Sequence, residues 1–432
     1  MIIVSFSLFT SLGLSQKLID IYKNGMVKLI PEMTYGANNN WGSLFNLYFD
    51  SINFNREEGE KKIITAPDGS VFMSHKNRHE IWKFGPDGNF VKSFGSKGGK
   101  PNQFPMLPSV ETVVDGKYVL TNDVNARLKL FDLDGNYFKS MKLDYMAGNF
   151  QPLSNGEILL EGNVMWRSQE PGSKYFSFKW RHVIVKLNIY SGEDKIIYDF
   201  FENGDFLYPV SQNMDSIKGI PPPGDKIYMP NYMIFRRPVF TLLKDGRFIQ
   251  SSRETGEVKV FDKAGKPQSS FKLEISPMSL TEKDISDNYE EIYNTLLNNI
   301  EMIKSNTTIA ENRKRTFLSQ SQASLDRINR YKDLSNYFPH LPYFSNIILD
   351  DEGNFLVFEF TDKEERQSNI FNVIAYDSSG QKLARTSFVC DNYDLSFSES
   401  TFVISKGYAY AVAKLKNFSG MPLRLVKFKI TN

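Results

Sequence analysis

Short apolar runs recur along most of the chain, and most of them end at a turn that contains glycine. Residues 61–94 give the clearest order, reading KKIITAPDGSVFMSH, then EIWKFGPDG, then NFVKSFG. The same order begins again at Pro108 and at Pro238, and in both cases a glycine follows the proline after eight positions. Runs of this kind, bounded by Asp-Gly turns, are typical of short antiparallel strands. The pattern therefore predicts a repeated four-stranded unit.

Three weaker copies bring the number of units to six, and they cover residues 148–200, 345–388 and 399–430. A four-stranded antiparallel unit has two apolar faces and open edges, so it must stack on neighbours, and closing a ring removes the open ends. We therefore predict an all-β fold, a six-bladed β-propeller over residues 61–432. An open stack of sheets is the alternative. The run MVKLIPEMTYG at 26–36, inside an N-terminal segment of residues 16–60, would complete the last unit and latch the ring.

The best-preserved unit, residues 95–135, reads GSKGGKPNQFPMLPSVETVVDGKYVLTNDVNARLKLFDLDG and resembles an NHL repeat. In that family glycines, Phe and Pro precede a strand, an Asp-Gly turn, a second strand and the run Asp-x-x-Asn-x-Arg. The resemblance places Asn122 at the family's Asp, Asn125 at its Asn and Arg127 at its Arg. It implies NHL-like blades in which Asn125 and Arg127, together with Asn122, form a structural clasp between adjacent loops. Other exported bacterial six-bladed propellers that the chain resembles are mostly of unknown function.

Two segments interrupt the repeat. Residues 201–235 separate the third and fourth units, and residues 277–341 separate the fourth and fifth. The second segment has apolar residues at helical spacing, namely Ile285, Tyr289, Ile292, Leu296, Ile300 and Ile303. Ser279 and Glu282 have capping-box spacing at its start, and a second helical run is expected over 308–334. We therefore predict a helical insertion between blades 4 and 5.

Both segments connect the last strand of one unit with the first strand of the next. In a propeller these connections lie on the same face as the loops between second and third strands, which are also long here, whereas tight turns occupy the opposite face. A scaffold that is elaborated on one face is expected to bind there. The helical insertion would act as a lid or as a surface for a partner, or would only pack on the ring.

Polar residues at the ends of the second strands would reach the mouth of the central channel on that face. They are His75, Asn122, Glu161 and Glu359. Asn122, Glu161 and Glu359 are candidate ligands for Ca²⁺ or another divalent cation, because lactonase-like six-bladed propellers use an acidic and amide set in such a place. In the alternative interpretation these side chains cap strands and bind water.

Two further features of the same face suggest an organic ligand. Arg236 and Arg237 form a pair of guanidinium groups that could bind a carboxylate, a sulfate or a sugar acid. Trp166 could stack on a sugar ring, although aromatic residues in long loops more often pack the loop itself. We treat all three as candidate ligand-binding residues.

Composition narrows the functional classes. With 52 basic and 50 acidic residues, the chain has almost no net charge, so its overall electrostatic potential does not favour nucleic acid or an anionic membrane as a partner. The single cysteine, Cys390, excludes an intrachain disulfide and a multi-thiolate metal cluster. The sequence also lacks a nucleophile elbow, a phosphate-binding glycine loop and a His-Glu-x-x-His motif. The histidines are too scattered for a His-rich metal centre, at His75, His79, His182 and His340.

The first 15 residues, MIIVSFSLFTSLGLS, carry no charge and end in small residues, which resembles a signal peptide. The run is too short to span a bilayer, and no cysteine follows it for a lipid anchor. We therefore expect a periplasmic or secreted monomer without a transmembrane segment. Its function is expected to be non-enzymatic binding of a small ligand, a glycan or an envelope protein. The alternative is a lactonase-like hydrolase or lyase with a divalent cation at the channel mouth.

Overall fold

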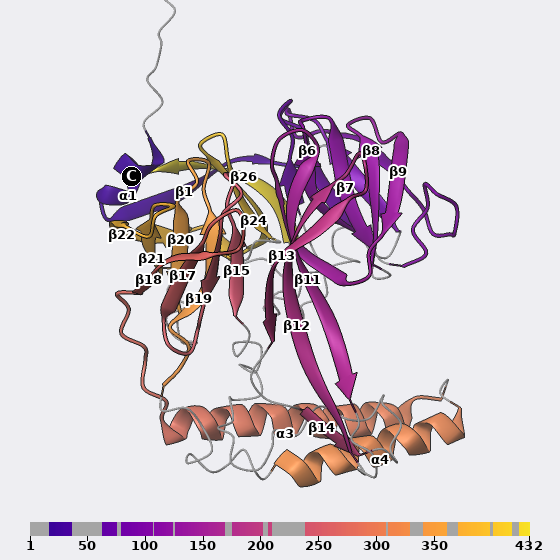
Figure 1. Ribbon diagram of the computed structural model, residues 1–432. Helices are drawn as coiled ribbons and strands as arrows, with labels where there is room; N and C mark the ends of the chain where they lie inside the picture. The colour runs from indigo at the N-terminus through magenta and orange to yellow at the C-terminus, as the bar shows by residue number, and fades with distance from the viewer. Residues whose placement is uncertain are drawn as a thin grey trace, which may run out of the picture.

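Consecutive antiparallel sheets make up the body of the protein in a propeller-like arrangement (Figure 1). The computed structural model describes residues 17–36, 63–75, 79–106, 108–123, 126–168, 175–201, 206–209, 238–307, 310–328, 340–360, 370–397, 401–416 and 423–432. The predicted mostly-β fold is thereby confirmed. Helices are few in this part of the chain, namely α1 (Leu18–Lys23), α3 (Glu282–Ser305) and α4 (Glu311–Ile328). None of these described helices has the length and apolar character needed to cross a bilayer.

The first two sheets have four strands each, connected in sequence order. The first sheet comprises β2 (Ile63–Thr65), β3 (Val71–His75), β4 (Glu80–Phe84) and β5 (Phe90–Phe94). The second comprises β6 (Pro108–Val114), β7 (Tyr118–Asp123), β8 (Arg127–Asp132) and β9 (Tyr137–Lys142). In the turn between β2 and β3, Gly69 has φ of 87°, a conformation that favours glycine, and the Asp68 carboxylate accepts a 2.9 Å hydrogen bond from the Ser70 amide. The Asp-Gly pairs of the sequence thus specify the turns and the register.

The third sheet differs from the first two because its two central strands are much longer. It comprises β10 (Met146–Pro152), β11 (Glu157–Ser168), β12 (Tyr175–Asn188) and β13 (Asp194–Phe201), with β14 (Phe206–Pro209) pairing with β12. Pairing with β10 ends at Asn163, whereas β11 and β12 stay paired as far as Ser168 and Ser177. Residues 164–168 and 175–181 therefore form a projecting hairpin, which we call the arm. The sequence indicated only a long insert here.

The fourth sheet is followed by the predicted helical insertion. Its strands are β15 (Val239–Leu242), β16 (Phe248–Ser251), β17 (Glu257–Phe261) and β18 (Pro267–Lys272). Helix α3 is capped by Thr281, whose side chain accepts a hydrogen bond from the Asp284 amide while Asp284 binds back to the Thr281 amide. The capping box predicted at Ser279 and Glu282 was therefore misplaced by two residues. Ser279 instead forms a β-bridge with His340, so the insertion leaves and re-enters the body at one point.

The last sheet has nine strands and contains the N-terminal strand. Its first run comprises β19 (Phe344–Leu349), β20 (Phe355–Glu359), β21 (Ile370–Tyr376) and β22 (Lys382–Val389). Its second run comprises β23 (Tyr393–Leu395), β24 (Phe402–Ser405), β25 (Tyr408–Leu415) and β26 (Leu423–Thr431). Strand β1 (Met26–Thr34) joins the two runs, because it is antiparallel to β26 and parallel to β22. The latch role predicted for this strand stays a prediction.

The core lies between neighbouring sheets. Separate clusters of buried side chains join the first sheet to the second, the second to the third, the third to the fourth, and the fourth to β19–β21. A further cluster joins β20–β22 to β24–β26 and β1. Finally, Tyr410 and Val412 of β25 pack with Met73 and Trp82 of the first sheet. The last described strands therefore contact the first sheet, and the chain closes on itself.

Candidate functional site

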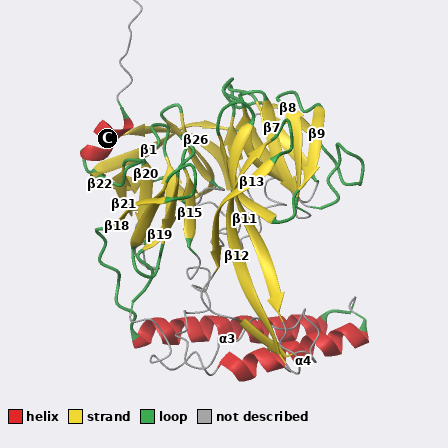
Figure 2. Ribbon diagram, in the orientation of Figure 1, coloured by secondary structure: helices red, strands yellow, loops and turns green. Residues whose placement is uncertain are grey.

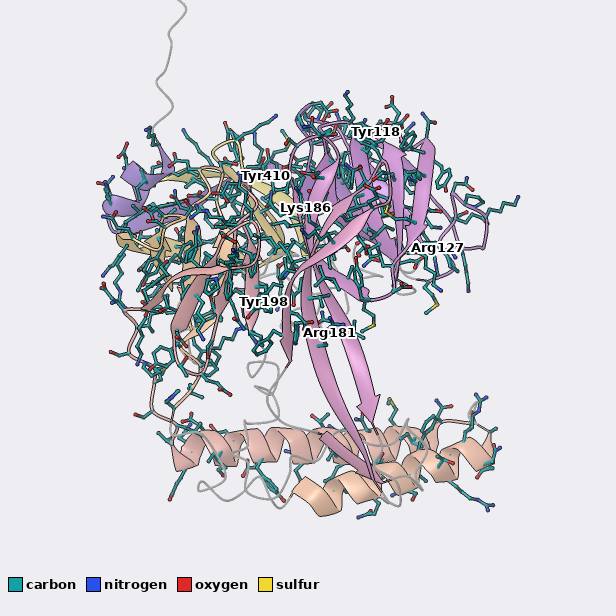
Figure 3. All side chains as sticks on the ribbon, viewed as in Figure 1. Tyr118, Arg127, Arg181, Lys186, Tyr198 and Tyr410 are labelled. Atoms are coloured by element: carbon teal, nitrogen blue, oxygen red, sulfur yellow. The ribbon has the colours of Figure 1, made fainter. Side chains whose placement is uncertain are left out.

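The arm and the helical pair project from the same side of the body, and we call this side the arm face (Figure 2). Arg127 and Arg181 lie toward this side, whereas Tyr118 lies at the opposite side (Figure 3). The opposite side carries the tight turns between first and second strands, such as the one at Gly116 that precedes Tyr118. The expectation that long connections gather on one face agrees with this placement.

A buried polar cluster lies where the arm leaves the third sheet. Glu161 and Asn163 lie two positions apart on β11, and Asn163 is directly opposite His182 on β12. Side chains two apart on one strand share a face with the residue opposite, so the three groups converge on one side of the sheet. The Glu161 Oε1 atom lies 3.5 Å from Nδ1 of His182, and the two side chains are 12% and 3% exposed. A carboxylate and an imidazole are thus held together away from solvent.

The surroundings of this cluster belong to the third and fourth sheets. The side-chain amide of Asn149, on β10, donates hydrogen bonds to Glu161 Oε2 at 3.0 Å and to the carbonyl oxygen of Phe240 at 3.5 Å. The His182 ring lies 6.2 Å from the Phe200 ring and 6.0 Å from the Phe240 ring. The polar side chains therefore lie between the third and fourth sheets, next to the aromatic rings of Phe200 and Phe240. Such a pair of carboxylate and imidazole can donate and accept protons, hold a polar ligand or bind a cation.

Asn122 lies on the other side of β10 from this cluster. Its side-chain amide donates a 3.0 Å hydrogen bond to the carbonyl oxygen of Ala147, which links the second sheet to the third. Its Oδ1 atom is inaccessible and has no hydrogen-bond partner in the described part of the chain. Arg127 is exposed and forms no hydrogen bond with Asn122 among the described residues. The proposed clasp therefore involves Asn122 without Arg127, and Asn125 lies outside the described residues.

Glu359 lies apart from the other candidates, at the end of β20. Its carboxylate forms an ion pair with Arg385 on β22. Asn122 and Glu161 approach β10 from two sides, and Glu359 belongs to another sheet, so a shared cation site for the three stays a prediction. Within the described ranges, no group of three or more His, Cys, Asp or Glu side chains could hold a metal ion.

The remaining candidates cannot be placed. The side chains of His75 and Trp166 lie outside the described part, although their backbones belong to β3 and β11. Arg236 and Arg237 lie outside the described residues altogether. Their roles as ligand-binding residues stay predictions.

Two buried cations of the sheet interfaces were not anticipated from the sequence. Lys129, on β8, donates from Nζ to the carbonyl oxygen of Gln103 and lies 4.9 Å from the Phe104 ring centre. Burial lowers the pKa of Lys129, an effect partly opposed by Asp123. The only available signal was that Lys129 occupies an inward position in the apolar run RLKLF.

Arg253 links the fourth sheet to β19. Its Nη2 atom donates a 2.7 Å hydrogen bond to the carbonyl oxygen of Ser345 and a 3.3 Å hydrogen bond to Oδ1 of Asn346, and the guanidinium lies 5.6 Å from the Phe344 ring centre. Like Asn122, it uses a side chain at the end of a second strand to reach the first strand of the next sheet. Inter-sheet clasps thus recur, but with different residue types in each copy.

The helical pair exposes apolar side chains on the arm face. Tyr289 and Tyr293 stack at 5.8 Å on α3. The exposed large apolar residues of the described helices are Tyr293, Leu297, Met302 and Phe317. A two-helix hairpin can bury only one apolar stripe between its helices. These four side chains therefore lie in contact with solvent outside that stripe.

Comparisons with known proteins give distant structural resemblances only. No family model matches the chain, and no curated protein matches it. A solved structure of a member of the DUF4221 family from Bacteroides vulgatus is 13% identical, with a TM-score of 0.46, over 95% of this chain and 100% of that one. A candidate exported protein from Bacteroides fragilis is 12% identical, with a TM-score of 0.42, over 87% and 91% of the two chains. Virginiamycin B lyase from Staphylococcus aureus is 9% identical, with a TM-score of 0.36, over 88% and 96%. These resemblances do not identify a ligand or a reaction for this chain.

Proposed function

We propose that the chain is an exported, six-bladed β-propeller with NHL-like blades that acts as a binding protein through its arm face. Six buried clusters among the described residues support the blade count, because five lie between neighbouring sheets and one lies between the two runs of the nine-stranded sheet, as the interfaces of a six-membered ring would. The turns of the first two sheets support the NHL-like frame. Export rests on the apolar, uncharged run at residues 1–15.

One observation carries the proposal of binding. The arm and the α3–α4 pair, which are far apart in sequence, both project from the same side of the ring (Figure 1). Neither is needed to close the ring, because the inter-sheet clusters lie within the sheets themselves. Long insertions on a closed scaffold commonly form binding surfaces.

Among small molecules, glycans and proteins, the exposed side chains of α3 and α4 favour a protein. Tyr293, Leu297, Met302 and Phe317 are large apolar groups in contact with solvent. Tyr293 and Leu297 are four residues apart and share one face of α3, and exposed apolar and aromatic side chains are typical of protein interfaces. A partner in the cell envelope agrees with an exported chain.

Excision of the helical insertion tests the proposal. Because Ser279 and His340 form a bridge and the Leu341 amide donates a 2.8 Å hydrogen bond to the Met278 carbonyl oxygen, residues 281–338 can be replaced by a short Gly-Ser linker. We expect the excised ring to fold and to lose a partner that co-purifies with the complete chain after cross-linking in the source cell's envelope fraction.

Two exposed phenylalanines provide a matched pair for the same experiment. Phe317, on α4, is 42% exposed and Phe138, on β9, is 49% exposed. We expect Phe317→Ser to weaken partner recovery and Phe138→Ser to leave it unchanged. Equal recovery from the complete chain, the excised ring and both variants would contradict a binding role for the arm face.

A further inference from the structure

The geometry of the cluster at the base of the arm is unusual for a hydrogen-bonded carboxylate and imidazole. Oxygen and nitrogen atoms in such a hydrogen bond lie about 2.7–3.2 Å apart. Glu161 Oε1 and His182 Nδ1 are 3.5 Å apart although both side chains are almost fully buried. The separation is too long for a good hydrogen bond, so the buried carboxylate and imidazole face each other without one between these two atoms.

Two ligands that share one metal ion have a separation close to this value. Zn²⁺ binds imidazole nitrogen and carboxylate oxygen at about 2.0–2.2 Å, and a tetrahedral angle then places the two ligand atoms about 3.3–3.5 Å apart. Glu161 Oε1 and His182 Nδ1 match that distance. A cation between them would also offset the burial of the carboxylate.

The remaining atoms of the cluster complete a donor set. Asn163 lies directly opposite His182 on the same face of the sheet. Its Oδ1 atom is inaccessible to solvent and has no hydrogen-bond partner in the described part of the chain. A buried amide oxygen without a partner is costly, and coordination to a cation would satisfy it.

The second carboxylate oxygen of Glu161, Oε2, accepts a hydrogen bond from a neighbouring side chain, as the second oxygen of a metal-ligating carboxylate commonly does. Asn149 Nδ2 donates to Glu161 Oε2 at 3.0 Å, which leaves Oε1 directed toward His182. Hydrogen bonds from neighbouring side chains commonly orient ligating carboxylates in this way. Asn149 also binds the Phe240 carbonyl oxygen at 3.5 Å, so the orientation is tied to the fourth sheet.

We propose that Glu161, Asn163 and His182 form a binding site for one first-row transition metal ion of the Zn²⁺ class. One imidazole nitrogen with two oxygens suits Zn²⁺ or Co²⁺ better than Ca²⁺, which takes six to eight oxygen ligands. The site shares Glu161 with the predicted set of Asn122, Glu161 and Glu359, but neither Asn122 nor Glu359 takes part in it. Three protein ligands leave one coordination position for water, and through Asn149 the bound ion would tie the base of the arm to the fourth sheet. This site does not depend on the binding function proposed above.

The test uses the full chain without an affinity tag, stripped of metal by a chelator. Zn²⁺ is titrated by calorimetry, and Co²⁺ is titrated by its visible absorption spectrum, which reports coordination number. We expect one ion per chain and a low-symmetry, four- or five-coordinate Co²⁺ spectrum. Because the chain folds around the site, we also expect added Zn²⁺ to raise the thermal midpoint.

Variants separate this site from adventitious binding. Glu161→Gln keeps the shape of the side chain and removes the charge, and Asn163→Leu removes the third donor, so each should weaken Zn²⁺ binding at least about tenfold. Asn149→Ala should weaken it by about 10–100-fold through loss of orientation. Glu359→Gln, at a carboxylate already paired with Arg385, is the matched control and should bind Zn²⁺ as the unmodified chain does.

Three outcomes would overturn the proposal. They are absence of Zn²⁺ and Co²⁺ binding at millimolar metal, equal affinity in Glu161→Gln and the unmodified chain, and an octahedral, all-oxygen Co²⁺ spectrum. His182→Ala removes a buried ring beside Phe200 and Phe240 and risks misfolding, so the test does not depend on it. None of these results bears on partner recovery through α3 and α4, and the two proposals can fail independently.

Discussion

The side-chain amide of Asn122 donates a 3.0 Å hydrogen bond to the carbonyl oxygen of Ala147, and through it the end of β7 is fastened to β10. A comparable link runs from Arg253, at the end of β16, to the carbonyl oxygen of Ser345 on β19. In both cases a side chain at the end of a second strand donates a hydrogen bond to a backbone carbonyl oxygen of the next sheet. These links oppose separation of neighbouring sheets at the arm face, where the insertions leave the ring.

Replacing Asn122 tests whether this link or the family's arginine stabilises the interface. Asn122→Ala leaves the Ala147 carbonyl oxygen without its donor, so we expect a loss of about 1–3 kcal/mol in the free energy of unfolding. Arg127→Ala should change it by less than about 0.5 kcal/mol, because Arg127 is exposed and does not bind Asn122. Urea unfolding followed by tryptophan fluorescence measures both. A larger loss for Arg127→Ala would restore the clasp implied by the NHL resemblance.

The position of Asn122 can be predicted from the sequence, whereas its hydrogen-bond partner cannot. The Asp-Gly turns and the apolar runs fix strand order, so the end of β7 could be predicted from residues such as Gly116 and Tyr118. The acceptor, however, is a backbone group of Ala147, and every residue has such a group. Only the stacking of sheets, which depends on the twist and register of both, decides which carbonyl lies within reach.

Of the three polar residues at the base of the arm, only one can be predicted from the sequence. Glu161 follows the apolar run EILL at the end of a second strand and was therefore a candidate. His182 and Asn163 were not, because the stretch between them was interpreted as an insert. Strand pairing across that insert brings Asn163 opposite His182, and no local spacing in the sequence reveals such a contact.

The small residue beside Glu161 should be intolerant of substitution. A Cβ atom added at Gly162 would meet Tyr145 Cδ2 at 2.6 Å and Val183 Cγ2 at 2.8 Å, both in the packed interface of the second and third sheets. We expect Gly162→Ala to cost about 1–3 kcal/mol in the free energy of unfolding through overpacking. Gly99→Ala, where the added atom has open space around it, serves as the control. Equal midpoints in urea for the two variants would rule out this account.

Strand β1 should contribute to the stability of the whole nine-stranded sheet. Leu29 is 3% exposed and packs in the cluster that joins β20–β22 to β24–β26, whereas its neighbour Ile30 is 49% exposed. We expect Leu29→Ala to lower the free energy of unfolding by about 2–5 kcal/mol. Ile30→Ala should lower it by less than about 0.5 kcal/mol.

Hydrogen exchange locates the effect of Leu29. Because β1 pairs with Ser387–Val389 of β22 on one side and with β26 on the other, Leu29→Ala should speed amide exchange in both strands together. Exchange that increased in β26 alone would show that β1 completes the last run of strands without joining it to β22.

Lys129 should make the stability of the ring depend on pH in the alkaline range. Burial among Phe104 and the first sheet lowers the pKa of Lys129 from its ordinary value of 10.5. Between the lowered pKa and about 10.5, the unfolded chain holds a proton that the folded chain has released, so the folded state gains stability as pH rises. The neutral amine can still donate to the Gln103 carbonyl oxygen, so this hydrogen bond survives deprotonation.

Comparison with Lys129→Met isolates this effect, because methionine keeps the aliphatic packing and cannot titrate. We expect the free energy of unfolding of the unmodified chain, relative to Lys129→Met, to increase as the pH rises from the lowered pKa of Lys129 toward about 10.5, with a slope of at most about 1.4 kcal/mol per pH unit. Lys142→Met, which removes an exposed lysine from the neighbouring strand, gives the baseline for alkaline effects common to all variants. A relative stability that fell with rising pH would mean that Asp123 holds the Lys129 ammonium more strongly than burial disfavours it.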